Sequence, residues 1–316
     1  MSEPWNLSFA PPTVIAARVL TRLPESFRRR GRTDWSDANK GGMEVDSFLE
    51  GPTFDREGNL YVVDIPFGRI FRVTPRLEWQ LVVQYDGWPN GLALHRDGTL
   101  WIADYRRGLL RLEAEALARG GSAAPVPVLG HRNSESFRGL NDLTFDRQGR
   151  LYFTDQGQTG LHDPTGRVYR HDLDRRTLDL VIDGVPSPNG VALDAAGKVL
   201  FVAVTRANQV WRGPILGDGT VSKVGAFRTF FGASGPDGMA VDAEGRLVVA
   251  HASLGGAFVL DAMGEVTHFV KSPSGSTVTN VAYRPGTSQL VMTESETGTI
   301  LEADLPGPGA GLFSHA

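Results

Sequence analysis

The chain repeats one short segment six times, and this repetition constrains the fold more than any other feature. Each copy has a polar residue near its start, an apolar stretch, a turn and a second apolar stretch, as in EGPTFDREGNLYVVD from Glu50 and PDGMAVDAEGRLVVAH from Pro236. The shortest step, from Glu50 to Asn90, is 40 residues, and the longest, from Asn90 to Asn141, is 51. Units of this length are typical of the blades of a propeller. The sequence therefore predicts an all-β, six-bladed β-propeller.

The polar residue that opens each repeat is expected to face a central channel. The innermost strand of each blade lines that channel, so the six opening residues should meet at one mouth: Glu50, Asn90, Asn141, Asn189, Asp237 and Asn280. The second strand of each blade runs antiparallel to the first and returns to the same mouth. The second strands end on Asp64, Asp104, Asp155, His251 and Glu294. Chemistry is therefore expected at this end of the channel.

The organisation of the rest of the chain follows from the repeats. Residues 1–316 form a single propeller domain, in which 50–305 hold the six repeats and 13–21 supply the strand that closes the ring. The stretch 22–49 fits no blade and is expected to be a mouth loop, acting either as a lid or as a solvated arm that adds little to the stability of any blade. Its basic run at 28–32 either grips an anionic group or is simply solvated.

Composition excludes several functional classes. The net charge of −4 argues against a nucleic-acid surface, and the absence of cysteine rules out disulfides and thiolate chemistry. No apolar run is long enough to span a membrane, and the N-terminus lacks the basic and apolar regions of a signal peptide. We therefore expect a cytoplasmic protein, a monomer or small homo-oligomer, without nucleic-acid or membrane partners.

Four of the opening residues favour a metal site. Glu50 and Asp237 would repel each other in a partly buried channel, and Asn141 and Asn189 add amide oxygens. One divalent cation would remove this repulsion, and oxygen ligands favour Ca²⁺, with Mg²⁺, Mn²⁺ or Zn²⁺ as alternatives. A structural interpretation also stands, in which these side chains only hold channel waters and cap strands.

The same residues carry a family resemblance. The segments Glu50-Gly51-Pro52, Leu140-Asn141-Asp142, Pro188-Asn189-Gly190 and Pro236-Asp237-Gly238-Met239 resemble those of the gluconolactonase, senescence-marker-protein (regucalcin) and luciferin-regenerating-enzyme family, to which diisopropyl-fluorophosphatase is related. The resemblance implies a six-bladed propeller and a catalytic divalent metal held by Glu50, Asn189 and Asp237. It also implies that Asn141 binds metal or substrate and that the reaction is hydrolysis of a lactone or, more rarely, of an organophosphate.

One departure from the family pattern bears on the substrate. Sugar-lactonase members often carry an arginine two residues before the position of Asn141, where this chain has Gly139, and the nearest arginine is Arg138. Arg138, Asn90, His251 and Asp155 are the candidate substrate contacts. The aromatic residues near the mouth, Trp88, Phe137 and Phe231, favour either a less polar ligand or simple packing.

The sequence thus predicts a metal-dependent lactonase. Asp237 is expected to act as general base toward a metal-activated water, and Asn141 to orient the carbonyl group. The alternatives are a phosphotriester hydrolase that uses the same residues, and a non-catalytic ligand-binding propeller with a structural metal.

Overall fold

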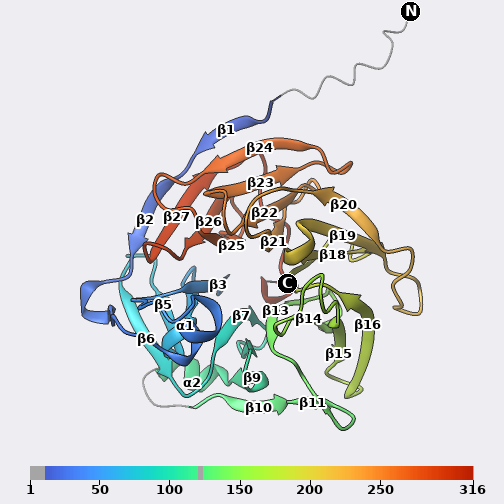
Figure 1. The fold of residues 1–316 in the computed structure, drawn as a ribbon, viewed down its shortest axis with the longest axis horizontal. Helices are drawn as coiled ribbons and strands as arrows, with labels where there is room; N and C mark the ends of the chain where they lie inside the picture. The colour runs from blue at the N-terminus through green and yellow to red at the C-terminus, as the bar shows by residue number, and fades with distance from the viewer. Residues whose placement is uncertain (1–10, 120–123, 316) are drawn as a thin grey trace, which may run out of the picture.

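In the computed structural model, which describes residues 11–119 and 124–315, six sheets surround a central axis (Figure 1). The prediction of a six-bladed β-propeller is confirmed. The innermost strands, one per blade, are β3 (Leu49–Phe54), β7 (Pro89–Leu94), β13 (Leu140–Phe145), β17 (Pro188–Leu193), β21 (Pro236–Val241) and β25 (Val278–Tyr283). Each contacts the next around the axis, and β25 contacts β3, so the ring of inner strands is closed.

The remaining strands of each blade follow in antiparallel order toward the rim. The second strands are β4 (Leu60–Asp64), β8 (Leu100–Asp104), β14 (Leu151–Asp155), β18 (Val199–Val204), β22 (Leu247–His251) and β26 (Gln289–Glu294). The third are β5 (Arg69–Val73), β9 (Gly108–Leu112), β15 (Gly166–Asp172), β19 (Gln209–Pro214), β23 (Gly256–Leu260) and β27 (Thr299–Asp304). The fourth are β6 (Trp79–Gln84), β10 (Val126–Leu129), β16 (Thr177–Val185), β20 (Gly225–Thr229) and β24 (Val266–Lys271). Second strands are almost wholly apolar because neighbouring blades cover both of their faces, as at the fully buried Val62 and Val63.

The segment predicted to close the ring is two strands rather than one. β1 (Thr13–Ala16) pairs in parallel with β24 of the fifth blade, and β2 (Arg18–Arg22) pairs antiparallel with β27 of the sixth. Between them, the Ala17 N–H still bonds to the Lys271 carbonyl at 2.9 Å. The N-terminal chain therefore supplies the outer strand of the last blade and an extra strand to its neighbour, which protects two sheet edges (Figure 1).

Every inner strand has a register shift near its start. In the third blade, Leu140 pairs with Asp155 and the next paired residue is Leu143, so Asn141 and Asp142 form a bulge. A comparable shift follows the first residue of the other inner strands, except in the first blade, where it follows the second residue, Glu50. Bulges re-aim side chains, and the third and sixth blades carry a polar pair at this place, whereas the other four carry a polar residue followed by glycine.

This register corrects the expectation for the sixth repeat. Val278 pairs with Glu294 as Leu140 pairs with Asp155, so Thr279 rather than Asn280 occupies the position of Asn141. Asn280 instead matches Asp142 and the glycines of the other four blades. Those glycines are required by close approach: a Cβ added at Gly190 would lie 2.3 Å from the Asp237 carbonyl oxygen of the next blade. The inner strands thus meet tightly at the level of the polar residues.

The segment 22–49 is packed more firmly than the sequence predicted. It contains a 3₁₀ turn, η1 (Glu25–Phe27), and a short helix, α1 (Asp34–Asn39), which begins with a capping box between Thr33 and Ser36. Trp35 is 7% exposed and joins the core of the first two blades, and the Phe27 carbonyl accepts a hydrogen bond from Arg69 at 2.6 Å. Trp35 and Phe27 thus tie the arm to the blades, which argues against the expectation that it adds little to blade stability.

The basic run of the arm is engaged within the arm itself. Arg28, Arg30 and Arg32 form ion pairs with Asp46, Glu44 and Asp37, respectively, and Arg28 also donates to the Thr297 carbonyl at 2.8 Å. The remaining short elements are the helix α2 (Ala114–Arg119), the hairpin strands β11 (His131–Arg132) and β12 (Glu135–Ser136), and the 3₁₀ turns η2 (Ile65–Phe67), η3 (Thr205–Ala207) and η4 (Phe313–His315).

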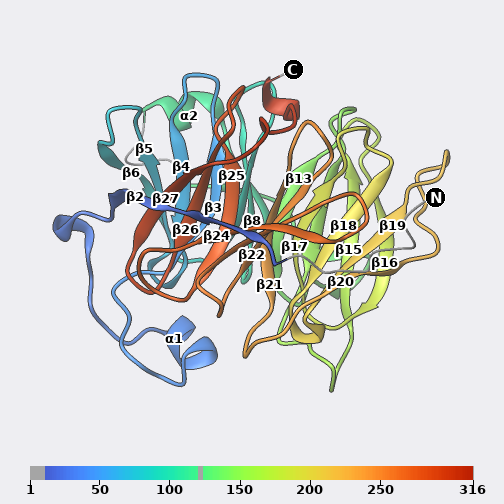
Figure 2. The same cartoon turned by 90° about the horizontal axis from the view of Figure 1, so that it is seen from above.

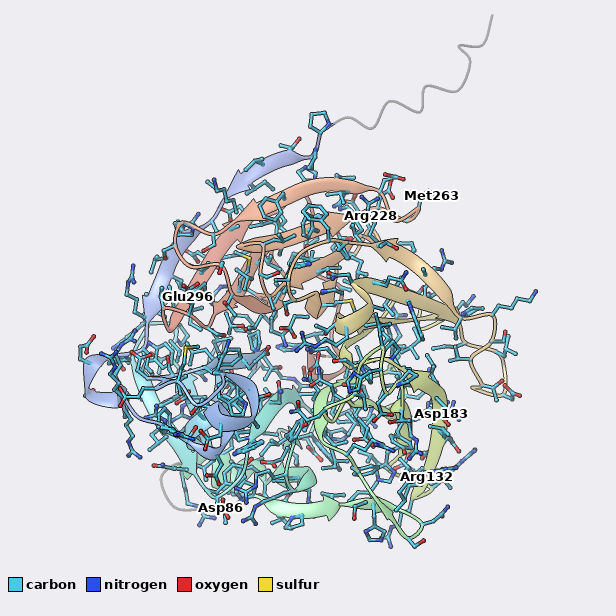
Figure 3. All side chains as sticks on the ribbon, viewed as in Figure 1. Asp86, Arg132, Asp183, Arg228, Met263 and Glu296 are labelled. Carbon is cyan, nitrogen blue, oxygen red and sulfur yellow. The ribbon has the colours of Figure 1, made fainter. Side chains whose placement is uncertain are left out.

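The propeller has two distinct faces. The arm with α1 lies on the face where the inner strands begin, here called the mouth face, whereas the C-terminal turn lies on the opposite, turn face (Figure 2). Charged side chains such as Asp86, Arg132 and Asp183 lie at the rim, far from the axis (Figure 3). No helix among residues 11–119 and 124–315 is long and apolar enough to cross a membrane. The N-terminal stretch in which no signal peptide was expected falls at 1–10, outside the described residues.

Candidate functional site

Glu50 is the buried centre of the polar ring at the channel axis. It is 4% exposed, and its Oε2 accepts hydrogen bonds from the Gly51 N–H at 2.7 Å and from the Asn280 Nδ2 at 2.9 Å. Burial raises the pKa of Glu50, and the charge of Asp142 adds to this rise. Asn280, although displaced by one residue from its expected position, therefore fixes the orientation of the Glu50 carboxylate.

Asp237 and Asp142 complete a set of three buried carboxyl groups. Burial raises the pKa of Asp237 well above its ordinary value, and the charges of Glu50 and Asp142 raise it further, while the Asn189 side chain offsets part of the effect. Burial also raises the pKa of Asp142 to about 7. The three groups come from the first, third and fifth blades. Folding therefore brings together carboxyl groups that repel one another when ionised.

Asn141 is held by a chain of side chains that spans two blades. Its Nδ2 donates to the Gln156 Oε1 at 2.9 Å, and the Gln156 Nε2 donates to the Ser187 Oγ at 3.0 Å. This orientation points the Asn141 Oδ1 away from Gln156. Ser187 has a φ of 66°, a left-handed conformation that is uncommon for serine and often occurs at functional sites.

The donor set fits a hard divalent cation. Glu50 and Asp237 supply carboxylate oxygens and Asn141 and Asn189 supply amide oxygens, the ligand types that Ca²⁺ prefers. Within the part of the chain that the structure describes, no group of three or more His, Cys, Asp or Glu side chains could hold a metal, so such a site depends on the amides. The contrast with Asp64 is informative, because that buried carboxylate is neutralised by Arg69. A cation at the ring would do the same for Glu50 and Asp237.

Two predicted substrate contacts lie away from the ring. Asp155 is fully buried, and its Oδ1 accepts the backbone N–H groups of Arg138 and Gly139 at 2.7 and 2.8 Å. His251 is also fully buried, with its ring 5.8 Å from that of Phe230 and 6.0 Å from that of Phe258. The expectation that these two residues contact substrate finds no support in this geometry, because Asp155 orders the connection that precedes its blade and His251 is packed against aromatic rings.

The other ends of second strands have the same structural role. The Asp104 Oδ1 accepts the N–H groups of Arg106 and Arg107, and the Glu294 carboxylate accepts those of Glu296 and Thr297. These carboxylates share the mouth face with the ring, as predicted. However, they order the loops between strands instead of facing the channel.

The remaining predicted contacts lie near the ring. Arg138 is on the mouth face, where its Nη1 lies 3.9 Å from the Asp163 Oδ2 and its side chain is 37% exposed. Asn90 begins the second blade at the position that matches Asn141 and is half-buried. Both stay candidate substrate contacts.

The structure adds residues that the sequence did not single out. Lys40, which follows α1, packs its ammonium group 4.9 Å from the centre of the Phe48 ring; burial lowers its pKa, while the charges of Glu296 and Asp237 oppose this lowering. Arg206, in η3, acts on Asp237 from the fourth blade. The sequence did hold a signal for Asp142, since it stands where four other repeats have glycine.

Comparisons with known proteins agree with this architecture. The lactonase drp35 of Staphylococcus aureus (strain MRSA252) is 29% identical over 273 residues, which cover 83% of this chain and 82% of that protein. A calcium-binding protein, regucalcin, from Agrobacterium tumefaciens superposes with a TM-score of 0.73 at 20% identity, over 96% of this chain and 98% of that one. A gluconolactonase from Xanthomonas campestris gives a TM-score of 0.72 at 20% identity, over 92% and 99%. The family model SMP-30/Gluconolactonase/LRE-like region matches residues 48–296, which contain all six inner strands, and the chain therefore belongs to this family.

Proposed function

We propose that this protein is a divalent-metal-dependent hydrolase that opens a lactone ring. The observation that carries the proposal is the burial of Glu50, Asp142 and Asp237 near the channel axis, where burial raises the pKa of all three, the charge of Asp142 raises that of Glu50 further, and the charges of Glu50 and Asp142 raise that of Asp237 further. Assembling such a set is unfavourable unless it binds a cation or a proton. Family membership and the names of the lactonase and gluconolactonase relatives support lactones as the substrate class.

Each ring residue then has a defined role. Glu50, Asn141, Asn189 and Asp237 would hold the ion, with Ca²⁺ as the first candidate. When bound, such an ion polarises a carbonyl oxygen and makes a nearby water more acidic. The hydrogen bond from Asn280 holds the Glu50 carboxylate in place, and the bond to Gln156 fixes Asn141 so that its amide can orient the substrate carbonyl.

Asp237 is suited to the role of general base. In the reaction, its carboxylate takes a proton from water, the water oxygen attacks the carbonyl carbon, and the ester bond to the ring oxygen breaks. The released oxygen takes a proton, which gives a hydroxy acid. Burial and the neighbouring carboxyl groups raise the pKa of Asp237, and a more basic carboxylate accepts this proton more readily.

The position of the arm is consistent with a role as a lid over the mouth. Lys40 precedes the first blade in sequence, yet it is influenced by Asp237 of the fifth blade and Glu296 of the sixth, so it overhangs the mouth. Its ammonium group is partly buried, and we place it opposite the acyl oxygen of a bound lactone or the carboxylate of the product. Arg138 and Asn90 remain candidate contacts for the rest of the substrate.

The test is a pH-indicator assay over sugar-acid and less polar lactones, with and without chelator. We expect acid release from at least one lactone, loss of activity in chelator and recovery on adding Ca²⁺, and inactivity of the Glu50→Gln variant. Turnover of phosphotriesters but of no lactone would replace the proposal with organophosphate hydrolysis. A wild-type protein inert toward both classes would favour a non-catalytic ligand-binding propeller. A cytoplasmic location and a monomeric or small oligomeric state also stay predictions, to be checked by cell fractionation and sedimentation.

A further inference from the structure

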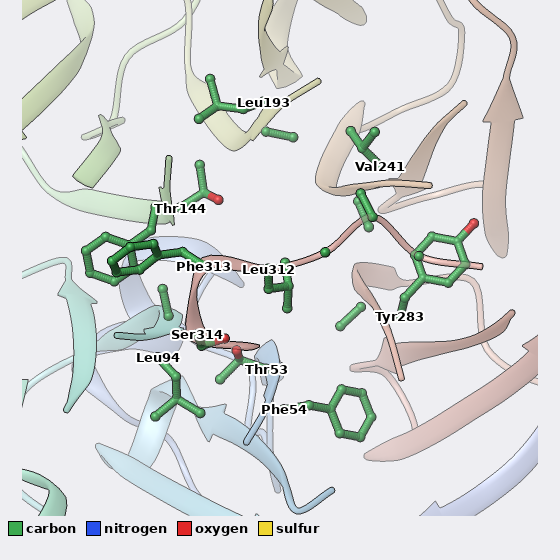
Figure 4. Close-up of a pocket in the computed structure, with 18 of the residues that line it drawn as sticks. Thr53, Phe54, Leu94, Thr144, Leu193, Val241, Tyr283, Leu312, Phe313 and Ser314 are labelled. Carbon is green, nitrogen blue, oxygen red and sulfur yellow. The ribbon is translucent and has the colours of Figure 1, made fainter. Parts of the chain in front are cut away.

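Beneath the polar ring, on the turn-face side, the channel contains a cavity of about 300 Å³ (Figure 4). The fifth residue of every inner strand lines it, and all six are small: Thr53, Ala93, Thr144, Ala192, Ala240 and Ala282. Because none of them carries a side chain larger than that of threonine, the inner strands meet at the ring without filling the axis below it. The cavity is thus a consequence of the repeat itself.

The C-terminal tail forms the floor of this cavity. On one side, the Gly309 N–H donates to the Thr287 carbonyl and the Ala310 N–H donates to the Val241 carbonyl, both at 3.0 Å. On the other side, the Arg56 Nε donates to the Ser314 carbonyl at 2.8 Å. The tail therefore crosses the opening of the channel from the fifth and sixth blades to the first (Figure 4).

The tail is held at its ends but not at its middle. The Phe313 ring is 7% exposed and lies 5.5 Å from the Phe145 ring, which fastens the far end. Leu312 is 44% exposed, and among the described residues no atom lies within 4 Å of a Cβ added at Gly311. Gly311 and the exposed Leu312 side chain are thus the least closely packed part of the floor, although the Leu312 carbonyl accepts the His315 N–H at 3.0 Å.

The roof of the cavity is polar, its inner walls are mainly apolar, and charged side chains of the turns, such as Asp146, Arg147 and Arg284, line its outer end. Asp142 and Asn280 close the upper end, while Leu92, Met239 and Val281 line the walls together with the small residues. The Asp142 carboxylate accepts the Leu143 N–H at 2.8 Å and the Val191 N–H at 3.4 Å, and a carboxylate has room for further donors. A molecule that fills this space therefore meets apolar surface along its length and a hydrogen-bond acceptor at one end.

We infer that this cavity is a second ligand site, for a small, uncharged and mainly apolar molecule that carries one hydrogen-bond donor, such as an alcohol. The volume matches the lower end of ligand pockets, about 300 Å³. The apolar inner walls favour an apolar molecule over water. The site lies on the opposite side of the ring from the mouth loops; it shares Asp142 and Asn280 with the ring, but its walls and floor take no part in the proposed lactone site.

Benzyl alcohol is the probe, and two alanines on opposite walls supply the variants. We expect benzyl alcohol to raise the melting temperature of the wild type in a saturable manner, because a ligand that binds only the folded state stabilises it. Ala240→Leu and Ala93→Leu, which fill the cavity from the fifth and second blades, should each weaken binding at least ~10-fold. Ala226→Leu, on the exposed outer strand β20, is the matched control and should bind as the wild type does. Equal affinity in all four proteins, or no saturable shift in the wild type, would overturn the inference.

Two further measurements locate the ligand and test its chemistry. Xenon-pressurised crystals should show density between the small residues of the wall and Leu312, and a continuous chain of ordered waters without xenon would contradict an apolar site. Toluene, which has a methyl group in place of the hydroxymethyl group, should bind more weakly than benzyl alcohol because it cannot donate to Asp142. If toluene binds as tightly, the requirement for a donor is wrong. Because two filling variants on different blades are used, failure of one to fold leaves the test intact.

Discussion

The replacement Asp237→Asn separates the two proposed roles of this residue, as a metal ligand and as a general base. The substitution keeps the shape of the side chain and one oxygen ligand but removes the charge and the base. At saturating Ca²⁺, we expect kcat to fall by at least ~10²-fold, which corresponds to about 2.7 kcal/mol in the activation free energy. Retention of full turnover under these conditions would show that Asp237 is neither base nor nucleophile.

The same variant also tests the electrostatic reasoning without any activity measurement. Asp237 is 8% exposed, and its pKa is raised by burial, Glu50 and Asp142. An acid with a raised pKa in the folded state destabilises that state whenever it is ionised, by about 1.4 kcal/mol for each pKa unit. In chelator at pH 8, Asp237→Asn should therefore raise the free energy of unfolding by at least about 1 kcal/mol.

Asp242→Asn is the matched control from the same repeat. Asp242 is 1% exposed, but its Oδ2 accepts from the Arg246 Nε at 2.6 Å and its Oδ1 from the backbone N–H groups of Glu244 and Arg246. Removing this compensated charge should lower stability and leave kcat unchanged. Urea unfolding in chelator gives the comparison, and destabilisation of both variants to a similar degree would refute the idea that the ring carboxyl groups repel one another.

Four further results are expected. One divalent ion, with Ca²⁺ as the first candidate, should copurify in a stoichiometric amount and raise the melting temperature. Elemental analysis that finds no metal, together with no thermal shift on adding Ca²⁺, Mn²⁺, Mg²⁺ or Zn²⁺, would contradict this. Lys40→Met should raise KM with little change in kcat, whereas Arg30→Met, on the exposed part of the arm, should alter neither; unchanged kinetics in both would make the arm purely structural. Burial lowers the pKa of His251 to about 4, so the free energy of unfolding should fall by up to roughly 3 kcal/mol as the pH drops from about 6.5 toward 4. In urea unfolding measured across this pH range, His251→Phe should remove most of this dependence. Arg69→Met should lower the free energy of unfolding by about 3–5 kcal/mol, because it leaves the Asp64 carboxylate buried without its partner; a loss below about 1 kcal/mol would mean that the pair is not isolated from solvent.

The His251 prediction rests on a desolvated imidazole. Among the described residues, neither ring nitrogen has a hydrogen-bond partner. A contact with the backbone of Phe231 opposes the lowering of the pKa but lacks hydrogen-bond geometry. The neutral ring is therefore favoured in the folded state, and protonation below pH 6.5 favours the unfolded chain.

The sequence by itself determined the architecture and most of the ring. Six copies of one segment predict six blades, and the polar residue at a fixed place in each copy predicts that Glu50, Asn141, Asn189 and Asp237 meet at the axis. The inference of six blades is confirmed because a repeat imposes its geometry locally: each copy must pack on its neighbours in the same way, so equivalent positions are expected at equivalent places. The glycine after Glu50, Asn189 and Asp237 is part of the same local rule.

The tertiary structure decided what lies outside the repeat and how residues act across blades. Only the observed register places Thr279 rather than Asn280 at the sixth equivalent position, and shows that Asn280 instead orients Glu50. Burial could not be read from the chain either: Asp155 and His251 end second strands beside the mouth, yet both are closed off from the channel. Whether a polar side chain faces the axis or a loop depends on bulges and blade twist, which are set by packing between blades.

The arm and the tail show the same division most clearly. Neither 22–49 nor the last residues belong to a repeat, so no periodicity fixes their place, and the sequence left the arm as either a lid or a solvated loop. In the structure, Trp35 packs into the core, Lys40 lies against Phe48 within reach of the charges of Asp237 and Glu296, and the C-terminal residues close the opposite end of the channel. These positions are set by contacts between segments far apart in the chain, and such contacts exist only once the ring of blades has closed.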